Sequence, residues 1–228
     1  MVLAVDTTSE IASLALHRDG KALAERELHS TEGFAHLIFP AIEQLLKSSG
    51  VALNEIDCFA AASGPGSFTG VRVGLAAVKG LAEATGKPAA GISNLRALSS
   101  FGNLPVRAVV LDARRGDVFT AVYNAEQQMT QPEAVMKFSA WLESLHLPSY
   151  EFIWPNGAPF RSMLLGTRFD EMPSIEAPRA LAKAIAFCAE IDGQKGQWRD
   201  PVELDANYVR RSDAELFWRD ACELARKK

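Results

Sequence analysis

The sequence is poor in the residues that build disulfide frameworks, metal knuckles and membrane spans. Its three cysteines, Cys58, Cys188 and Cys222, are odd in number and widely spaced, which argues against a disulfide scaffold and a zinc knuckle. No apolar run approaches the roughly 18 residues that cross a bilayer. The N-terminus, MVLAVDTTSE, has no basic region of the kind that opens a signal peptide. We therefore expect a cytoplasmic globular protein without a membrane span.

Positive charge is also scarce. Lys and Arg number 24 against 28 Asp and Glu, so the formal net charge is −4. Because neutralising a nucleic-acid backbone needs clustered cations, this balance argues against a free-standing nucleic-acid binder. The apolar share of 48% is, by contrast, ample for one large folded domain or two small ones.

Self-contained catalytic constellations are missing from the sequence as well. No HExxH motif occurs, and no two histidines lie three or four residues apart among His17, His29, His36 and His146. No serine sits in a nucleophile elbow. The sequence therefore predicts no catalytic residue and no metal site, which counts against a metallopeptidase and a serine hydrolase.

A repeated pattern is what the chain does contain. Residues 1–6 form an apolar run that ends in a carboxylate, typical of a buried central strand, and residues 11–28 follow it as a hairpin that turns at Arg18-Asp19-Gly20. Residues 109–112 and 117–123 repeat this layout. The repeat predicts an α/β fold of two lobes, 1–104 and 105–228, each with a mixed β-sheet flanked by helices. The alternative interpretation is that the two segments are similar only because any two strands followed by turns look alike.

Apolar spacing and turn signals place the other elements. A strand is predicted at 56–62 and a short one at 152–154. Helices are predicted at 32–48, from 71 to near Gly86, and at 139–145, 177–190 and 213–228.

A glycine-rich loop joins the strand at 56–62 to the helix that follows it. The loop reads Ser63-Gly64-Pro65-Gly66-Ser67-Phe68-Thr69-Gly70. Backbone N–H groups in such a loop can converge on an anion at the helix N-terminus, but no Gly-Lys-Ser/Thr ends it, so it is not a P-loop. A tight strand-to-helix turn, in which small residues allow close packing, is an equally good interpretation.

Asp6 and Asp112 each end a predicted strand beside a turn. In two-lobed nucleotide-binding folds, carboxylates at these places hold a hydrated Mg²⁺ beside the phosphates, whereas turn or cap residues hold no ligand. The space through which a nucleotide could approach is narrowed by Thr7, which follows Asp6, and by Ala113-Arg114-Arg115, which follow Asp112. We therefore predict at most a vestigial nucleotide site, formed by Asp6, Thr7, Thr8, Gly64, Gly66, Ser67, Thr69 and Asp112.

Three motifs together resemble a known family. They are Leu3-Ala4-Val5-Asp6-Thr7-Thr8, the stretch Gly64-Pro65-Gly66-Ser67-Phe68-Thr69-Gly70-Val71-Arg72-Val73-Gly74, and Leu111-Asp112-Ala113-Arg114 with Val118-Phe119. In this order they are similar to the TsaB (YeaZ) family, paralogues of the TsaD family. The stretch Asn207-Tyr208-Val209-Arg210 resembles the tail of the same family. The resemblance implies a two-lobed, actin-like (ASKHA) fold, in agreement with the repeat.

The resemblance also implies a function. It implies a non-catalytic scaffold that is needed for threonylcarbamoyl transfer to adenosine 37 of tRNAs reading ANN codons, with the chemistry carried out by a TsaD-type paralogue. That paralogue has a metal-binding HxxxH after the equivalent loop and helix, whereas residues 91–98 of this chain hold no histidine.

The partners follow from the same resemblance. The chain is expected to form a heterodimer with the TsaD-type paralogue, which a TsaE-type ATPase joins. ATP and Mg²⁺ are then handled by the partner subunits, so no intrinsic cofactor is expected, and tRNA is met only through the complex. A homodimer is possible when the partner is absent, because an exposed apolar patch tends to be covered.

The two predicted helices of the first lobe are rich in apolar and small residues. Such helices either fill the core of their own lobe or contact another subunit. In the family the equivalent helices pair with those of the TsaD-type paralogue. We therefore predict a partner interface formed by Phe34, Leu37, Ile38, Ala41, Leu45, Val71, Leu75, Val78 and Ala82.

An enzyme of another class is the competing hypothesis. An actin-like nucleotide hydrolase or small-molecule kinase would use Asp6, Asp112 and the glycine-rich loop. The two hypotheses differ in whether the isolated chain binds ATP·Mg²⁺ and turns it over.

Overall fold

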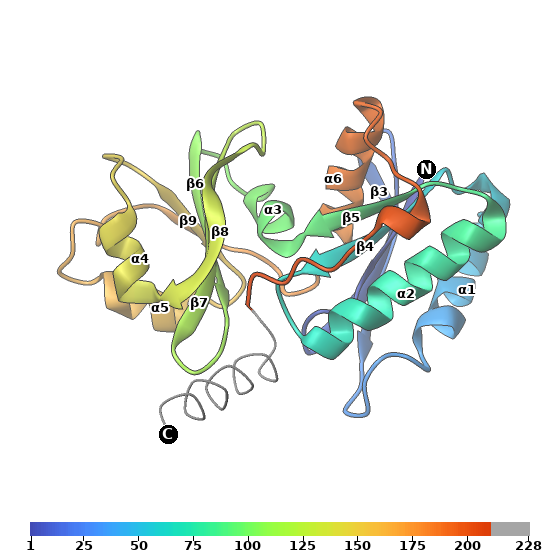
Figure 1. The fold of residues 1–228 in the computed structure, drawn as a ribbon, viewed down its shortest axis with the longest axis horizontal. Coiled ribbons are helices and arrows are strands. Elements are labelled where there is room, and N and C mark those ends of the chain that lie inside the picture. Colours follow the sequence, from blue (N-terminus) through green and yellow to red (C-terminus); the bar gives the residue numbers. More distant parts are fainter. Residues whose placement is uncertain (211–228) are drawn as a thin grey trace, which may run out of the picture.

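The computed structural model describes residues 1–210, which form two lobes, each built on a five-stranded mixed sheet (Figure 1). In the first sheet the strand order is β3-β2-β1-β4-β5, and in the second it is β8-β7-β6-β9-β10. The strands of the first sheet are β1 (Val2–Asp6), β2 (Ile11–Arg18), β3 (Lys21–His29), β4 (Cys58–Gly64) and β5 (Ala89–Ser93). Those of the second are β6 (Val106–Asp112), β7 (Asp117–Asn124), β8 (Met129–Lys137), β9 (Glu151–Trp154) and β10 (Ser174–Glu176).

Both sheets have the same topology. In the first, β1 pairs antiparallel with β2 and parallel with β4; in the second, β6 pairs antiparallel with β7 and parallel with β9. Asp6 and Asp112 therefore end the two equivalent central strands. The predicted duplicated mixed sheet is confirmed.

Two helices, α1 (Ile38–Ser49) and α2 (Phe68–Thr85), cover one face of the first sheet (Figure 1). Each ends at a glycine in the left-handed conformation, where the backbone N–H caps the last turn. The helix predicted at 32–48 in fact begins at Ile38, because Gly33 has a φ of 86°, which no right-handed helix allows, and residues 34–37 form a turn before the helix. The short 3₁₀ helix η1 (Leu53–Glu55) precedes β4.

The opposite face of the first sheet is covered by α3 (Asn94–Ser99) and by α6 (Ala182–Gln194), which comes from the far end of the sequence. Arg96 on α3 donates to Asp192 on α6 at 2.7 and 2.6 Å. The predicted division at residue 104 falls where the chain passes from one sheet to the other. The chain from α6 to the 3₁₀ helix η2 (Pro201–Glu203) nevertheless packs on the first lobe.

The second lobe has an outer and an inner core. On the outer face, α4 (Phe138–Ser144) and α5 (Ala158–Leu164) pack on the sheet through an aromatic cluster that includes Trp141, Phe152 and Trp154. The inner face joins α3, α6 and the first sheet in one hydrophobic cluster. The two lobes therefore share a continuous core.

The predicted helices α2, α4 and α6 are present with shifted ends, whereas β5, α3, β8, α5 and β10 had no sequence prediction. The helix predicted at 213–228 lies outside the described residues. Of the helices within residues 1–210, none has the length and hydrophobicity to cross a membrane.

Candidate functional site between the lobes

Asp6 ends β1 with its side chain enclosed, at 0% exposure. Its Oδ1 accepts the backbone N–H of Thr8 at 2.9 Å and the Thr8 hydroxyl at 2.6 Å. Burial raises the pKa of the Asp6 carboxyl above 3.8, although the bonds from Thr8 and from the backbone of Leu181, beside the start of α6, oppose this rise. Within residues 1–210, Asp6 Oδ2 has no hydrogen-bond partner. A carboxylate sealed in this way does not face a hydrated metal ion.

Thr7 and Thr8 use their hydroxyl groups inside the protein. Thr7 Oγ1 donates to the carbonyl oxygen of Gly70 at 2.6 Å. Thr8 Oγ1, which donates to Asp6, accepts a hydrogen bond from Asn94 Nδ2 at 2.5 Å. Both threonines are buried, and their hydroxyls hold the turn between β1 and β2 to α2 and α3.

The glycines of the loop are required by close backbone contacts. A Cβ at Gly70 would lie 1.9 Å from the Thr7 carbonyl oxygen, and one at Gly66 would lie 2.7 Å from that of Thr8. Gly64 also has a φ of 104°. Ser67 caps α2 by accepting the Gly70 N–H at 3.2 Å. These contacts support the interpretation of the loop as a tight strand-to-helix turn.

A cavity of about 200 Å³ lies beside the first turn of α2. Three of the residues predicted for the nucleotide site line it, namely Thr7, Ser67 and the exposed Thr69, and so does Phe34 of the predicted partner interface. The rest of its lining comes from the first lobe, including the segment 30–34. The cavity therefore does not bring the loop together with Asp112.

Asp112 is exposed at the start of the turn 113–116 in the second lobe. Its Oδ1 accepts the backbone N–H of Arg114 at 2.7 Å, which is the role of a turn residue. Arg114 and Arg115 have φ values of 64° and 55°, which is uncommon for residues other than glycine.

Residues 204–210 run from the first lobe to this turn, and we call them the strap (Figure 1, orange to red). The backbone N–H of Asn207 donates to the carbonyl oxygen of Ser63 at 2.7 Å. Arg210 donates to Asp117 Oδ2 at 2.6 Å. The strap thus connects the glycine-rich loop to the hairpin of β6 and β7. It lies between the predicted site residues of the first lobe and Asp112 of the second.

Arg210 makes one further hydrogen bond on the second lobe, and the carboxylate that it binds has a second cationic partner. Its guanidinium donates to the Ala113 carbonyl oxygen at 3.0 Å, and Asp117 is shared with Lys137 at 2.7 Å. The pKa of Asp117 lies below 3.8 because Lys137, and then Arg210, stabilise its charge. The end of the strap is therefore held by an ionised carboxylate at neutral pH.

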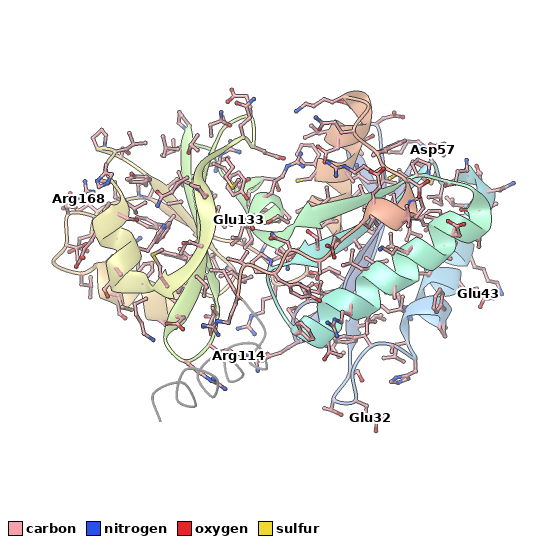
Figure 2. The ribbon with its side chains drawn as sticks, viewed as in Figure 1. Glu32, Glu43, Asp57, Arg114, Glu133 and Arg168 are labelled. Atoms are coloured by element: carbon pink, nitrogen blue, oxygen red, sulfur yellow. The ribbon has the colours of Figure 1, made fainter. Side chains whose placement is uncertain are left out.

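Glu133 on β8 collects hydrogen bonds from three other elements. Its Oε1 accepts the hydroxyls of Ser93 and of Tyr123, the latter at 2.8 Å, and its Oε2 accepts Asn207 Nδ2 at 2.5 Å. Burial, and then the charge of Glu133, raise the pKa of Tyr123. Figure 2 shows Glu133 on the side of the second lobe that faces the first. Glu133 therefore links both sheets and the strap.

Sequence reasoning missed Glu133 and gave Asn207 and Arg210 no role beyond resemblance to a family tail. No local pattern marks Glu133, because its three partners lie 10, 40 and 74 residues away in sequence. Within residues 1–210, the side chains of His, Cys, Asp and Glu form no group that could hold a metal ion. The polar side chains that make the most hydrogen bonds between the lobes thus bond to other parts of the protein itself.

A protein-family model described as "TsaD: tRNA N6-adenosine threonylcarbamoyltransferase" matches residues 28–185. The chain belongs to this family. Its relatives include the TsaB protein of Escherichia coli strain K12, which is 36% identical over 60% of this chain and 62% of that protein. The TsaB protein of Bacillus subtilis strain 168 is 28% identical over 95% of this chain and 97% of its own.

Solved structures agree with this placement in the family. A structure described as "YeaZ from Pseudomonas aeruginosa" has a TM-score of 0.71 and 26% identity, covering 91% of this chain and 98% of that one. The chain is thus a TsaB-type (YeaZ-type) paralogue of TsaD. Two other solved structures, a 2-hydroxyisocaproyl-CoA dehydratase activator from Clostridium difficile and an ethanolamine utilisation protein from Carboxydothermus hydrogenoformans, have TM-scores of 0.51 and 0.53 at 10% identity. They share only the fold, which is the predicted actin-like (ASKHA) fold.

In this TsaB-type chain the residues predicted for the partner interface face inward. Phe34, Ile38, Ala41, Leu45, Val71, Leu75, Val78 and Ala82 are all buried in the first-lobe core, and Leu37 is half-buried against it. The reason is that the apolar stripe of each helix lies on the sheet. Their placement corresponds to the alternative interpretation, an intramolecular core.

The outward face of α2 carries a ridge of exposed residues spaced four apart. They are Phe68, Arg72, Ala76, Gly80 and Ala84, which we call the α2 ridge. A Cβ built at Gly80 would meet nothing within 4 Å. On α1 the exposed side chains include Phe39 and Glu43, of which Glu43 is labelled in Figure 2.

Proposed function

We propose that the chain is a non-catalytic scaffold subunit for threonylcarbamoyl transfer to adenosine 37 of tRNA, and that it acts by pairing with a larger catalytic paralogue of the TsaD type. In this proposal ATP and Mg²⁺ are handled by that paralogue and by a TsaE-type ATPase, and tRNA is met only within the complex. The membership of the TsaD family and the similarity to TsaB proteins support it.

The observation that carries the proposal is the state of the region between the lobes. Asp6 is sealed, the hydroxyls of Thr7 and Thr8 are engaged, and the strap lies between the loop and Asp112. A nucleotide hydrolase or kinase needs an accessible carboxylate for its metal and a path for the phosphates. The groups of this chain are instead committed to holding its own parts together, which suits a scaffold.

The α2 ridge is the face we assign to the paralogue. A glycine within a helix costs about 1 kcal/mol relative to alanine, yet Gly80 has open space around its Cα and no positive φ, so the chain's own packing does not require it. Ala76 and Ala84 flank it at helical spacing on the same side. Small residues in line allow the backbone of another helix to approach closely, so a helix of the paralogue fits along this ridge.

The test is binding of the purified chain to its TsaD-type paralogue, measured by calorimetry and by co-elution. Gly80→Arg adds a side chain where nothing in the chain stands in the way. We therefore expect Gly80→Arg to melt at the same or a higher temperature than the wild type, since arginine favours the helix, but to bind at least about tenfold more weakly. Ala140→Arg, at an exposed position of α4 on the second lobe, is the matched control and should bind within about twofold of the wild type.

Two results would count against the proposal. Failure of the wild-type chain to bind the paralogue would remove the scaffold function, and ATP turnover by the isolated chain would favour the enzyme hypothesis. Unchanged binding of the paralogue by Gly80→Arg would mean that the interface lies elsewhere than on the α2 ridge. A homodimer formed in the absence of the paralogue should be disrupted by the same substitution if it uses the same ridge.

A further inference from the structure

Tyr208 of the strap lies on α2 as part of a small surface cluster. Its ring stacks on that of Phe68 with the centroids 5.2 Å apart, and its hydroxyl accepts a hydrogen bond from Arg72 Nε at 3.0 Å. The Arg72 guanidinium lies 3.8 Å from the centre of the Phe68 ring. Phe68 and Tyr208 keep 40% and 45% of their surface exposed, so the cluster is open to a partner.

The cluster is continuous with the face assigned to the paralogue. Phe68 and Arg72 are the first two members of the α2 ridge, and side chains four apart lie one above another on a helix. From Phe68 to Gly80 the ridge is roughly 18 Å long, at about 1.5 Å per residue. A helix of the paralogue that packs over Gly80 and extends along the ridge would therefore reach Tyr208.

The strap is also held at both sides of Tyr208 by the region between the lobes. Asn207 bonds to Ser63 in the first lobe and to Glu133 in the second, and Arg210 bonds to Asp117. Two extended residues span at most roughly 7 Å, so the position of Tyr208 depends directly on these anchors. Without them a partner would have to order the strap when it binds, which weakens binding.

We infer that the strap couples the α2 ridge to the arrangement of the two lobes, so that the affinity for the paralogue is set partly by anchors on the second lobe that the paralogue does not touch. The inference rests on the proposed function, because it concerns the regulation of the same binding face. It makes Asn207 and Arg210 positioning residues for Tyr208. It also gives the region between the lobes a role other than nucleotide binding.

Arg210→Ala tests the inference, because it removes one of the two side-chain anchors that hold the strap to the second lobe and leaves the ridge unchanged. We expect it to bind the paralogue about tenfold more weakly than the wild type, within the usual range of coupling between sites. Arg161→Ala is the matched control, since Arg161 is an exposed arginine of the second lobe whose guanidinium donates to Ser174 and to the Met172 carbonyl oxygen within its own lobe. It should bind within about twofold of the wild type.

A second variant and a second measurement guard against loss of folding. Tyr208→Ala removes a half-exposed side chain and should weaken binding as Arg210→Ala does. In hydrogen exchange, binding of the paralogue should slow the amides of the turn 113–116 in the wild type but not in Arg210→Ala. Wild-type affinity in Arg210→Ala, or an equal loss in Arg161→Ala, would overturn the inference.

The failure of the two ideas can be told apart. If the wild type binds, Gly80→Arg does not, and Arg210→Ala binds normally, the proposed function stands and the coupling is refuted. If the wild type does not bind the paralogue, the proposed function fails and the coupling fails with it.

Discussion

The side-chain amide of Asn207 donates to the Glu133 carboxylate at 2.5 Å, across 74 residues of sequence. The same carboxylate accepts hydroxyls from β5 and β7 through Ser93 and Tyr123. One acid thus gathers donors from the first sheet, the second sheet and the strap. A buried or half-buried acceptor with several donors is expensive to replace, because each donor left without it loses its partner.

Glu133→Gln should therefore destabilise the fold. The glutamine NH₂ group cannot accept a hydrogen bond, so either the bond from Asn207 is lost or the hydroxyls of Ser93 and Tyr123 must turn from donating to accepting. We expect a loss of about 1–3 kcal/mol in the free energy of unfolding, measured by urea titration. Glu171→Gln, at an exposed position, should change stability by less than about 0.5 kcal/mol. Equal stability of Glu133→Gln and the wild type would show that Glu133 does not hold the lobes.

Two glycines of α2 should respond to alanine in opposite directions. At Gly70 the new Cβ would lie 1.9 Å from the Thr7 carbonyl oxygen, whereas at Gly80 it meets nothing. We expect Gly70→Ala to lose about 3 kcal/mol or more, or to fail to fold, because backbone must shift. Gly80→Ala should gain about 0.5–1 kcal/mol. Thermal unfolding of the pair checks both, and a tolerated Gly70→Ala would contradict the tight-turn interpretation.

Asp6→Asn should change how stability depends on pH. Burial raises the pKa of Asp6 in the folded state above 3.8, so the folded protein holds a proton that the unfolded chain releases. The stabilisation from this group is complete below pH 3.8 and is lost as the pH rises through the folded pKa. Relative to the wild type, Asp6→Asn should therefore become progressively more stable between about pH 4 and that higher pKa.

Melting temperatures of both proteins from pH 4 to pH 8 measure this difference, with about 2–4 °C expected per kcal/mol for a chain of this size. An asparagine side chain keeps an oxygen that can accept the hydrogen bonds from Thr8, so these bonds are retained in the variant. A constant gap between the two curves would mean that Asp6 ionises normally in the fold.

Cys58 and Cys188 should be inert to thiol reagents in the native protein. Burial raises the pKa of each thiol to about 12, and the thiolate is the reactive form. In a Cys222→Ser chain, an aromatic disulfide reagent at pH 8 should detect no thiol until urea is added, after which it should detect both. Rapid labelling of the native chain would show that one of these sites opens.

The central strands could be predicted from the sequence because their signals are local. An apolar run that ends in Asp, followed by a turn and a second strand, specified the hairpins that begin at β1 and β6. Gly86 marked the end of α2 for the same reason. β5 was missed because its sequence, AAGIS, holds small residues and a glycine that favour no strand by themselves.

The roles of the site residues could not be predicted in the same way. Asp6 and Asp112 end equivalent strands, yet only Asp6 is buried, because α6 begins beside it and no such helix covers Asp112 among the described residues. The apolar faces of α1 and α2 were equally suited to a core or an interface, and only tertiary packing decides between these. Glu133 acquires its importance from partners that no sequence window contains.

The return of α6 to the first sheet has a consequence for how the chain is made. A ribosome releases the strands β1 to β5 long before α6, and in the interval the face of that sheet with Ala4, Ala60 and Ile92 lacks most of its cover. Folding during synthesis usually proceeds from the N-terminal domain, but here the first lobe must wait for the second to be translated. A nascent chain halted near residue 104 would therefore expose an apolar sheet face to which chaperones bind. The two lobes would complete their folding together rather than one after the other.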